Sequence, residues 1–73
     1  MNKEQFIQIV ELQLGRKRVK MEDRLMEDLG AESMDIVNLA VHIEEQSGVF
    51  IPVESMPRLE TVAELYQYIQ SLR

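Results

Sequence analysis

The chain has 73 residues, a formal net charge of −5, no cysteine and a hydrophobic fraction of 45%. A chain of this length buries only about 60% of the surface that it exposes when unfolded, so we predict one small domain over residues 1–73. The lack of cysteine excludes disulfides and thiolate metal sites. The negative charge argues against nucleic-acid binding. Together these features favour a binding or carrier module over an enzyme.

Three segments have apolar residues at helical spacing, over residues 3–14, 33–46 and 62–72. The third begins with Thr61 and Glu64 at the spacing of a capping box. The middle segment is apolar around most of its circumference. We therefore expect it to be the central helix, with neighbours on more than one side.

The connection over residues 15–32 is long for so small a domain. It contains Leu25, Met26 and Leu29, which are spaced like one turn anchored in the core. We call this segment the first loop and expect these three side chains to attach it to the helices.

The connection over residues 48–60, which we call the second connection, is expected to hold one short helical turn. Ser55 and Met56 can begin such a turn, and Pro57 limits its length. The pattern predicts an all-α fold, a bundle of three to four helices with a long first loop.

Charge is unevenly distributed along the chain. Residues 1–20 hold five basic and two acidic side chains, whereas residues 22–45 hold eight acidic side chains against Arg24 alone. The acidic stretch fits either a solvated face or a docking surface for basic partners. Residues 16–20, the basic run, lack aromatic residues, which favours a solvated loop over a nucleic-acid or anionic-membrane site.

Several kinds of catalytic and metal chemistry are excluded by spacing. His42 lies nine residues after Ser33, roughly 13 Å along a helix at about 1.5 Å per residue, so the two cannot form a nucleophile–base pair on this helix. His42 is interpreted as an ordinary helix-surface residue. The acidic pairs at 22–23 and 27–28 lack the ligand pattern of a calcium-binding loop. We predict no catalytic residue and no dedicated metal site.

Ser33 stands where the first loop becomes the central helix, after Gly30, which permits a tight turn. Serine is a common helix N-cap, which is the simplest interpretation. The position also suits an attachment point, because a phosphodiester there would meet free backbone N–H groups and the positive end of the helix dipole. Glu32, Asp35 and Asp28 oppose that charge, so such a phosphate has to stay solvated, as it does on a mobile arm.

Residues 27–35, Glu-Asp-Leu-Gly-Ala-Glu-Ser-Met-Asp, resemble the signature of the acyl carrier protein family. The likeness continues through Glu44-Glu45, Ile51-Pro52 and Thr61-Val62 and covers nearly the whole chain. The resemblance implies that Ser33 is the attachment site of 4'-phosphopantetheine, delivered from coenzyme A by a phosphopantetheinyl transferase. The thiol of that arm would carry an acyl group as a thioester.

The same resemblance implies a small four-helix bundle, with three longer helices, one short third helix near residues 55–59 and a long first loop. It also implies a partner-binding surface on the central helix. A helical wheel independently places apolar Met34 and Val41 on one line with Asn38 and Glu45, with Glu44 at its edge. An apolar spot rimmed by charge is typical of a transient interface. The predicted partner-contacting residues are Glu32, Met34, Asp35, Asn38, Val41, Glu44 and Glu45.

Several departures from the family pattern point to a specialised carrier rather than the housekeeping one of fatty-acid synthesis, among them Ser47-Gly48 at the end of the central helix and the extra proline in residues 53–58. Asn38 stands where many fatty-acid carriers have a glutamate, and the basic run is atypical. The resemblance leaves the cargo open. The bundle interior is hypothesised to take up part of the acyl chain, lined by Leu39, Ile43, Ile51, Val62 and Leu65.

The predicted protein is thus a monomeric, stand-alone carrier and not itself an enzyme. It presents acyl groups to acyl-transferring, condensing or modifying enzymes of fatty-acid, polyketide or related biosynthesis, through their basic docking patches. A cytoplasmic location is expected, since the N-terminus lacks a secretory pattern and no apolar run approaches the roughly 20 residues of a membrane span. The alternative is an acidic helical interaction module in which Ser33 is only a helix N-cap.

Overall fold

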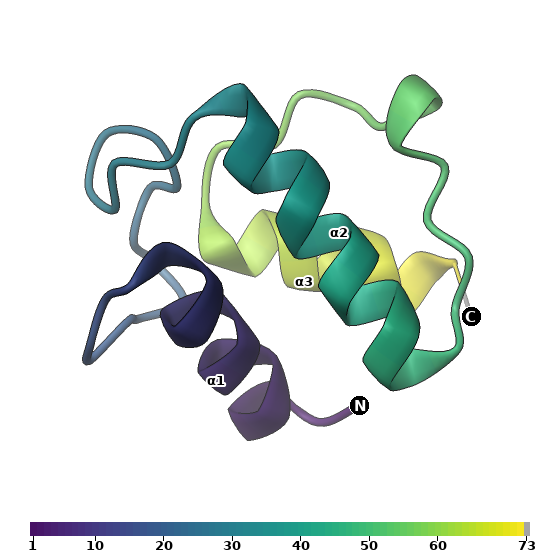
Figure 1. Cartoon of the computed structure of the whole chain (residues 1–73), viewed down its shortest axis with the longest axis horizontal. Helices are drawn as coiled ribbons and strands as arrows, with labels where there is room; N and C mark the ends of the chain where they lie inside the picture. Colours follow the sequence, from purple (N-terminus) through teal and green to yellow (C-terminus); the bar gives the residue numbers. More distant parts are fainter. Residues whose placement is uncertain (73) are drawn as a thin grey trace.

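The computed structural model describes residues 1–72, which form three α-helices and one 3-10 turn (Figure 1). Helix α1 spans Lys3–Leu14, α2 spans Ser33–Ser47 and α3 spans Val62–Ser71, and the 3-10 turn η1 spans Val53–Ser55. The predicted all-α class is confirmed. The three predicted helices agree with the observed ones to within one residue at each end.

The ends of the helices are set by local side-chain and backbone chemistry. The Asn2 side chain accepts from the Gln5 N–H at 2.8 Å and caps α1, which ends at Gly15 in the left-handed conformation (φ +65°). At α3, the Thr61 hydroxyl accepts from the Glu64 N–H at 3.1 Å, and the Glu64 carboxylate accepts from the Thr61 N–H at 2.9 Å. The capping box predicted at this helix is therefore confirmed.

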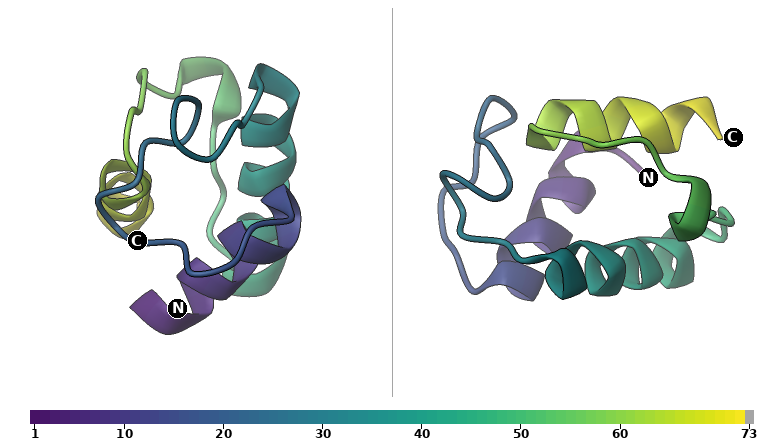
Figure 2. Two further views of the ribbon diagram at one scale, coloured as in Figure 1. Left: turned by 90° about the vertical axis from the view of Figure 1, so that its left-hand side faces the viewer. Right: turned by 90° about the horizontal axis from the view of Figure 1, so that it is seen from above.

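The core is built by one apolar face from each helix. Figure 2 shows α2 and α3 along opposite sides of the molecule, both beginning at the end that holds the first loop, with α1 running from the α3 side to the α2 side. The Phe6 and Tyr66 rings meet at a centroid distance of 5.1 Å and join α1 to α3. The largest fully buried side chains are Phe6, Val10, Leu25, Leu39, Ile43, Val62, Leu65 and Ile69.

The first loop is anchored in this core by two of its three predicted side chains. Leu25 and Leu29 are buried, as predicted, but Met26 is 51% exposed, so its prediction as an anchor is wrong. The segment forms a helix-like turn in which the Asp28 N–H donates to Arg24 O at 2.9 Å. In such a turn, residues four apart share a face and the next residue points away, which places Met26 in solvent.

Backbone hydrogen bonds also join the first loop to the start of α3. The Leu25 N–H donates to Glu60 O at 2.8 Å, and the Val62 N–H donates to Asp23 O at 2.9 Å. These bonds satisfy backbone groups of both segments next to the buried Leu25 and Val62 side chains. The first loop is consequently held on its backbone as well as by its side chains.

The short helix predicted near residues 55–59 is not formed there. The structure has instead the 3-10 turn Val53–Ser55, which ends at Met56 with an extended backbone (φ −66°, ψ 130°). Met56 precedes Pro57, and a proline ring disfavours the helical conformation of the residue before it. The turn therefore ends at Ser55, two residues before Pro57, and does not begin there as predicted.

No helix within residues 1–72 is long and apolar enough to cross a membrane.

Candidate functional site

The first loop ends at Glu32, which is the N-cap residue of α2. Its backbone is extended (φ −101°, ψ 173°). Its carbonyl accepts from the Ile36 N–H at 3.2 Å, and its own N–H donates to the Asp35 carboxylate at 2.8 Å. Ser33 is therefore the first residue inside the helix. The alternative prediction of Ser33 as the N-cap is wrong, because Glu32 takes the extended capping conformation one residue earlier.

The Ser33 side chain is exposed, and so are its neighbours Glu32 and Met34. Ser33 also lies in the first turn of α2, where backbone N–H groups have no partner within the helix. An accessible hydroxyl at such a position fits covalent attachment of a phosphate-linked group. Glu32 and Asp35 add negative charge on either side, which favours a solvated phosphate over a tightly held one.

The turn before Ser33 depends on Gly30, whose φ of +71° is in the left-handed region. The Gly30 N–H donates to Met26 O at 3.1 Å, and the Ala31 N–H donates to Leu25 O at 2.9 Å. These two bonds connect the anchored part of the first loop to the residues just before the helix. These hydrogen bonds therefore link the position of Ser33 to the buried Leu25 side chain.

The basic run is only partly a solvated loop. Lys17, Arg18 and Lys20 are exposed, as predicted. Val19 is buried, however, and its N–H donates to the Glu11 carboxylate of α1 at 3.1 Å.

Arg16 is exposed as well, as predicted, but its side chain also makes a contact within the fold. Its Nε donates to Leu29 O at 3.2 Å, across thirteen positions of the sequence. The spacing of charges along the sequence gave no sign of this contact, because it depends on how the first loop folds back over the end of α1.

Most of the predicted partner-contacting residues lie exposed on or beside α2. Met34 is 64% exposed and Val41 is 48% exposed. The exposed polar members of the set are Glu32, Asn38 and Glu45. The structure thus leaves two apolar side chains uncovered on a helix whose other exposed groups, apart from the Ser33 hydroxyl, are acidic or amide.

The two remaining members of that set have hydrogen-bonding roles within the fold. The Glu44 carboxylate accepts from the Ile51 N–H at 2.9 Å, which ties the second connection to α2. The Asp35 carboxylate accepts from the Glu32 N–H at the start of the same helix. Both side chains are half-buried. Their charges remain part of the acidic surface, but their carboxylates are already engaged.

Arg24 and Asp28 form an ion pair on the first loop, near the start of residues 27–35, which we call the family-like run. The Asp28 carboxylate accepts from the Arg24 backbone N–H at 2.8 Å and from its Nε at 3.3 Å. The backbone hydrogen bond is the main cause that lowers the pKa of Asp28, and the side-chain bond adds to it. The same pair raises the pKa of Arg24, so both groups stay charged at neutral pH.

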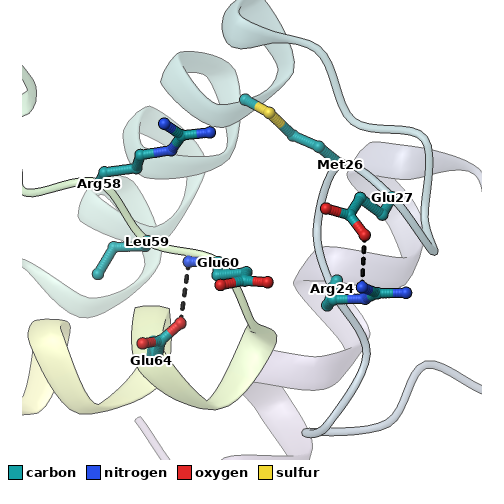
Figure 3. Close-up of a pocket in the computed structure, with 7 residues that line it drawn as sticks. All are labelled: Arg24, Met26, Glu27, Arg58, Leu59, Glu60 and Glu64. Atoms are coloured by element: carbon teal, nitrogen blue, oxygen red, sulfur yellow. Dashed lines mark hydrogen bonds and ion pairs between the residues drawn. The ribbon is translucent and has the colours of Figure 1, made fainter.

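A cleft of about 270 Å³ lies between the first loop and the second connection (Figure 3). Met26 and Arg58 extend toward one another across it in Figure 3. Arg24 is paired with Glu27, and Glu64 accepts from the Glu60 N–H. The rim is therefore of mixed charge and partly neutralised. Sequence reasoning did not predict this cleft, since its walls are distant in the chain.

His42 is half-buried on α2 and lines a groove together with Ile9 and Leu12 of α1. The interpretation of His42 as an ordinary helix-surface residue is therefore only partly right. Within the described residues, no three histidine, cysteine, aspartate or glutamate side chains are grouped so that they could hold a metal ion.

Residues 4–69 match a protein family described as "Phosphopantetheine attachment site". The chain is 38% identical over 64 residues to an acyl carrier protein of Campylobacter curvus, covering 88% of this chain and 83% of that protein. It is 35% identical to acyl carrier proteins of Wolinella succinogenes and Helicobacter hepaticus, each over 63 residues, covering 86% of this chain and 83% of each relative. The chain belongs to the acyl carrier protein family.

Proposed function

We propose that this protein carries acyl groups on a 4'-phosphopantetheine arm attached to Ser33. The observation that supports this most directly is the exposed hydroxyl of Ser33 in the first turn of α2, inside the family-like run of residues 27–35. The match of residues 4–69 to a phosphopantetheine attachment family supports the same assignment. The alternative of a non-carrier module loses its main argument, because Ser33 is not needed as the helix cap.

Attachment requires a phosphopantetheinyl transferase and coenzyme A. The Ser33 oxygen forms a bond to the phosphorus next to pantetheine, and the pyrophosphate bond of coenzyme A breaks. The adenosine bisphosphate leaves with the electron pair of that bond, and the serine proton passes to a base of the transferase. When attached, the arm supplies a thiol that holds the acyl group as a thioester. This chain supplies the anchor and the presenting surface, and its partner enzymes carry out the reactions.

We propose that partner enzymes dock on the exposed side of α2. Met34 and Val41 would contribute apolar contact, with Asn38 beside them. Glu32 and Glu45 would attract basic patches, and the charges of Asp35 and Glu44 would add to the same field. Enzymes of fatty-acid, polyketide or related biosynthesis are the expected partners. We expect Glu45→Gln to weaken docking more strongly at low salt than at high salt.

The interior is proposed to take up part of the acyl chain. Each buried methylene would contribute about 0.8 kcal/mol. All of the predicted lining residues are buried, so an acyl chain that enters would have to move them apart. These residues are Leu39, Ile43, Ile51, Val62 and Leu65. A structure of the acylated protein with its acyl chain wholly in solvent would refute this part. A monomeric single domain, in which the 3-10 turn η1 takes the place of the fourth, short helix of the predicted bundle, belongs to the same proposal.

The test of the anchor is the intact mass of the protein after incubation with coenzyme A and a broad-specificity phosphopantetheinyl transferase. We expect one added phosphopantetheine on the wild type and on Ser55→Ala, and none on Ser33→Ala. Ser55 is a matched control because it is another exposed serine. Since Ser33 is exposed and not an N-cap, its replacement should change stability by less than about 0.5 kcal/mol. A folded wild type that stays unmodified with two transferases would contradict the proposal.

A further inference from the structure

We infer that Arg16 is a positioning residue for modification of Ser33: its guanidinium clamps the turn before α2 and sets where the serine hydroxyl is presented. The inference rests on the proposed attachment at Ser33. It concerns a side chain of the basic run, thirteen or more positions away from the turn that it contacts.

The backbone of Arg16 is fixed to the end of α1. Its N–H donates to Glu11 O at 3.0 Å, directly after Gly15, the capping residue of α1. Its Nε donates to Leu29 O at 3.2 Å. Arg16 therefore joins the end of one helix to the turn that leads into the next.

The same guanidinium lies against Gly30. A Cβ atom on Gly30 would come within 3.2 Å of a terminal nitrogen of Arg16. The left-handed backbone of Gly30 and its missing side chain thus allow the guanidinium to lie close over the turn. Gly30 is three residues before Ser33, so a shift of the turn moves the start of α2.

Arg16 and the core hold opposite sides of this turn. Leu25 and Leu29 are buried beneath it, while Gly30 is exposed. Arg16 reaches it from outside the core, with a planar donor group that a lysine does not reproduce. Small errors in the position of a reacting group are costly, because misplacement by about 1 Å can reduce a rate about a hundredfold. A clamp on this turn therefore matters for a reaction at Ser33.

Lys17 provides a matched control, since it is the next residue, carries the same charge and is exposed. Arg16→Met and Lys17→Met remove one positive charge each, so any effect of charge on the KM of the transferase should be similar in both. We expect Arg16→Met to lower kcat for phosphopantetheine transfer about tenfold relative to Lys17→Met. The charge-conserving pair Arg16→Lys and Lys17→Arg should show the same order, with kcat reduced only in Arg16→Lys.

Amide hydrogen exchange of the unmodified protein gives a second readout that needs no transferase. The N–H groups of Gly30 and Ala31 are bonded within the turn. Their exchange should be faster in both Arg16 variants and unchanged in both Lys17 variants, with exchange in α3 unaltered. Circular dichroism shows whether each variant is folded. If Arg16→Met does not fold, the Arg16→Lys and Lys17→Arg pair decides.

Equal kcat values within each matched pair, together with unchanged exchange of Gly30 and Ala31, would overturn the inference. The proposed function would survive that result, because the wild type would still gain one phosphopantetheine. A folded wild type that takes up no phosphopantetheine would overturn both. Reduced kcat with unchanged KM and faster exchange confined to the turn would support the clamp.

Discussion

The two long connections of this protein are held in different ways. The first loop buries four apolar side chains, those of Val19, Leu25, Leu29 and Ala31, and its backbone bonds to Glu60 of the second connection and to Val62 of α3. The second connection buries Ile51 but leaves Phe50 72% exposed, and it contains only one 3-10 turn. The connection that leads into Ser33 is thus the one with more attachments. This difference indicates that a precise start of α2 matters more than a fixed path between α2 and α3.

The largest expected effect comes from removing the main anchor of the first loop. Leu25 is fully buried, so Leu25→Ala should reduce the free energy of unfolding by about 2–5 kcal/mol. Phe50→Ala, in the second connection, should change it by less than about 0.5 kcal/mol. Equilibrium unfolding in urea measures both. A large loss for Phe50→Ala would show that the second connection is held by contacts of equal weight.

The second prediction compares two glycines with the same backbone conformation. Gly30 and Gly48 have φ values of +71° and +74°, so alanine at either position should cost about 1–2 kcal/mol of stability. A Cβ at Gly48 meets nothing within 4 Å, whereas one at Gly30 meets Arg16. Gly30→Ala should therefore be the more destabilising, and the difference should shrink in an Arg16→Met background. Equal costs in the wild-type background would mean that the guanidinium moves away freely.

The third prediction concerns Glu44, which ties the second connection to α2. Glu44→Met removes the acceptor of the Ile51 N–H and should cost about 1 kcal/mol. Glu45→Met, its exposed neighbour, should stay within about 0.5 kcal/mol of the wild type. Amide exchange of Ile51 should accelerate in the first variant alone. Unchanged exchange would show that other contacts hold this part of the connection.

The three helices were predictable because their signals are local. Apolar spacing and the Thr61 to Glu64 capping box lie within one or two turns of sequence. The family-like run likewise pointed to Ser33. The sequence did not reveal how the turn in the first loop is rotated, which exposes Met26. It also did not reveal that the backbone of Met56 is extended. The contacts of Arg16 and Glu44 were missed as well, because each joins segments that only the folded chain brings together.

The smallest predicted effect is a pH dependence that touches both connections. Hydrogen bonds from the Arg24 backbone and side chain lower the pKa of Asp28 in the first loop. Those from the Thr61 and Glu60 N–H groups lower the pKa of Glu64, where the second connection meets α3. A carboxyl whose pKa is lower in the folded state binds fewer protons there than in the unfolded chain. Its contribution to stability is therefore complete above the unfolded pKa and is lost as the pH falls through the folded pKa.

With ordinary values of 3.8 for Asp28 and 4.5 for Glu64, the loss should begin near these pH values and continue below them. Asp28→Asn and Glu64→Gln should each flatten the decline of Tm between pH 5 and pH 3, and the double variant should flatten it further. The effect should be modest, because both carboxylates are exposed. Asp28→Asn should also speed amide exchange of Arg24, and Glu64→Gln that of Thr61. If one variant alone changed amide exchange in both connections, the two connections would open as one cooperative unit, joined through the hydrogen bond from the Leu25 N–H to Glu60 O.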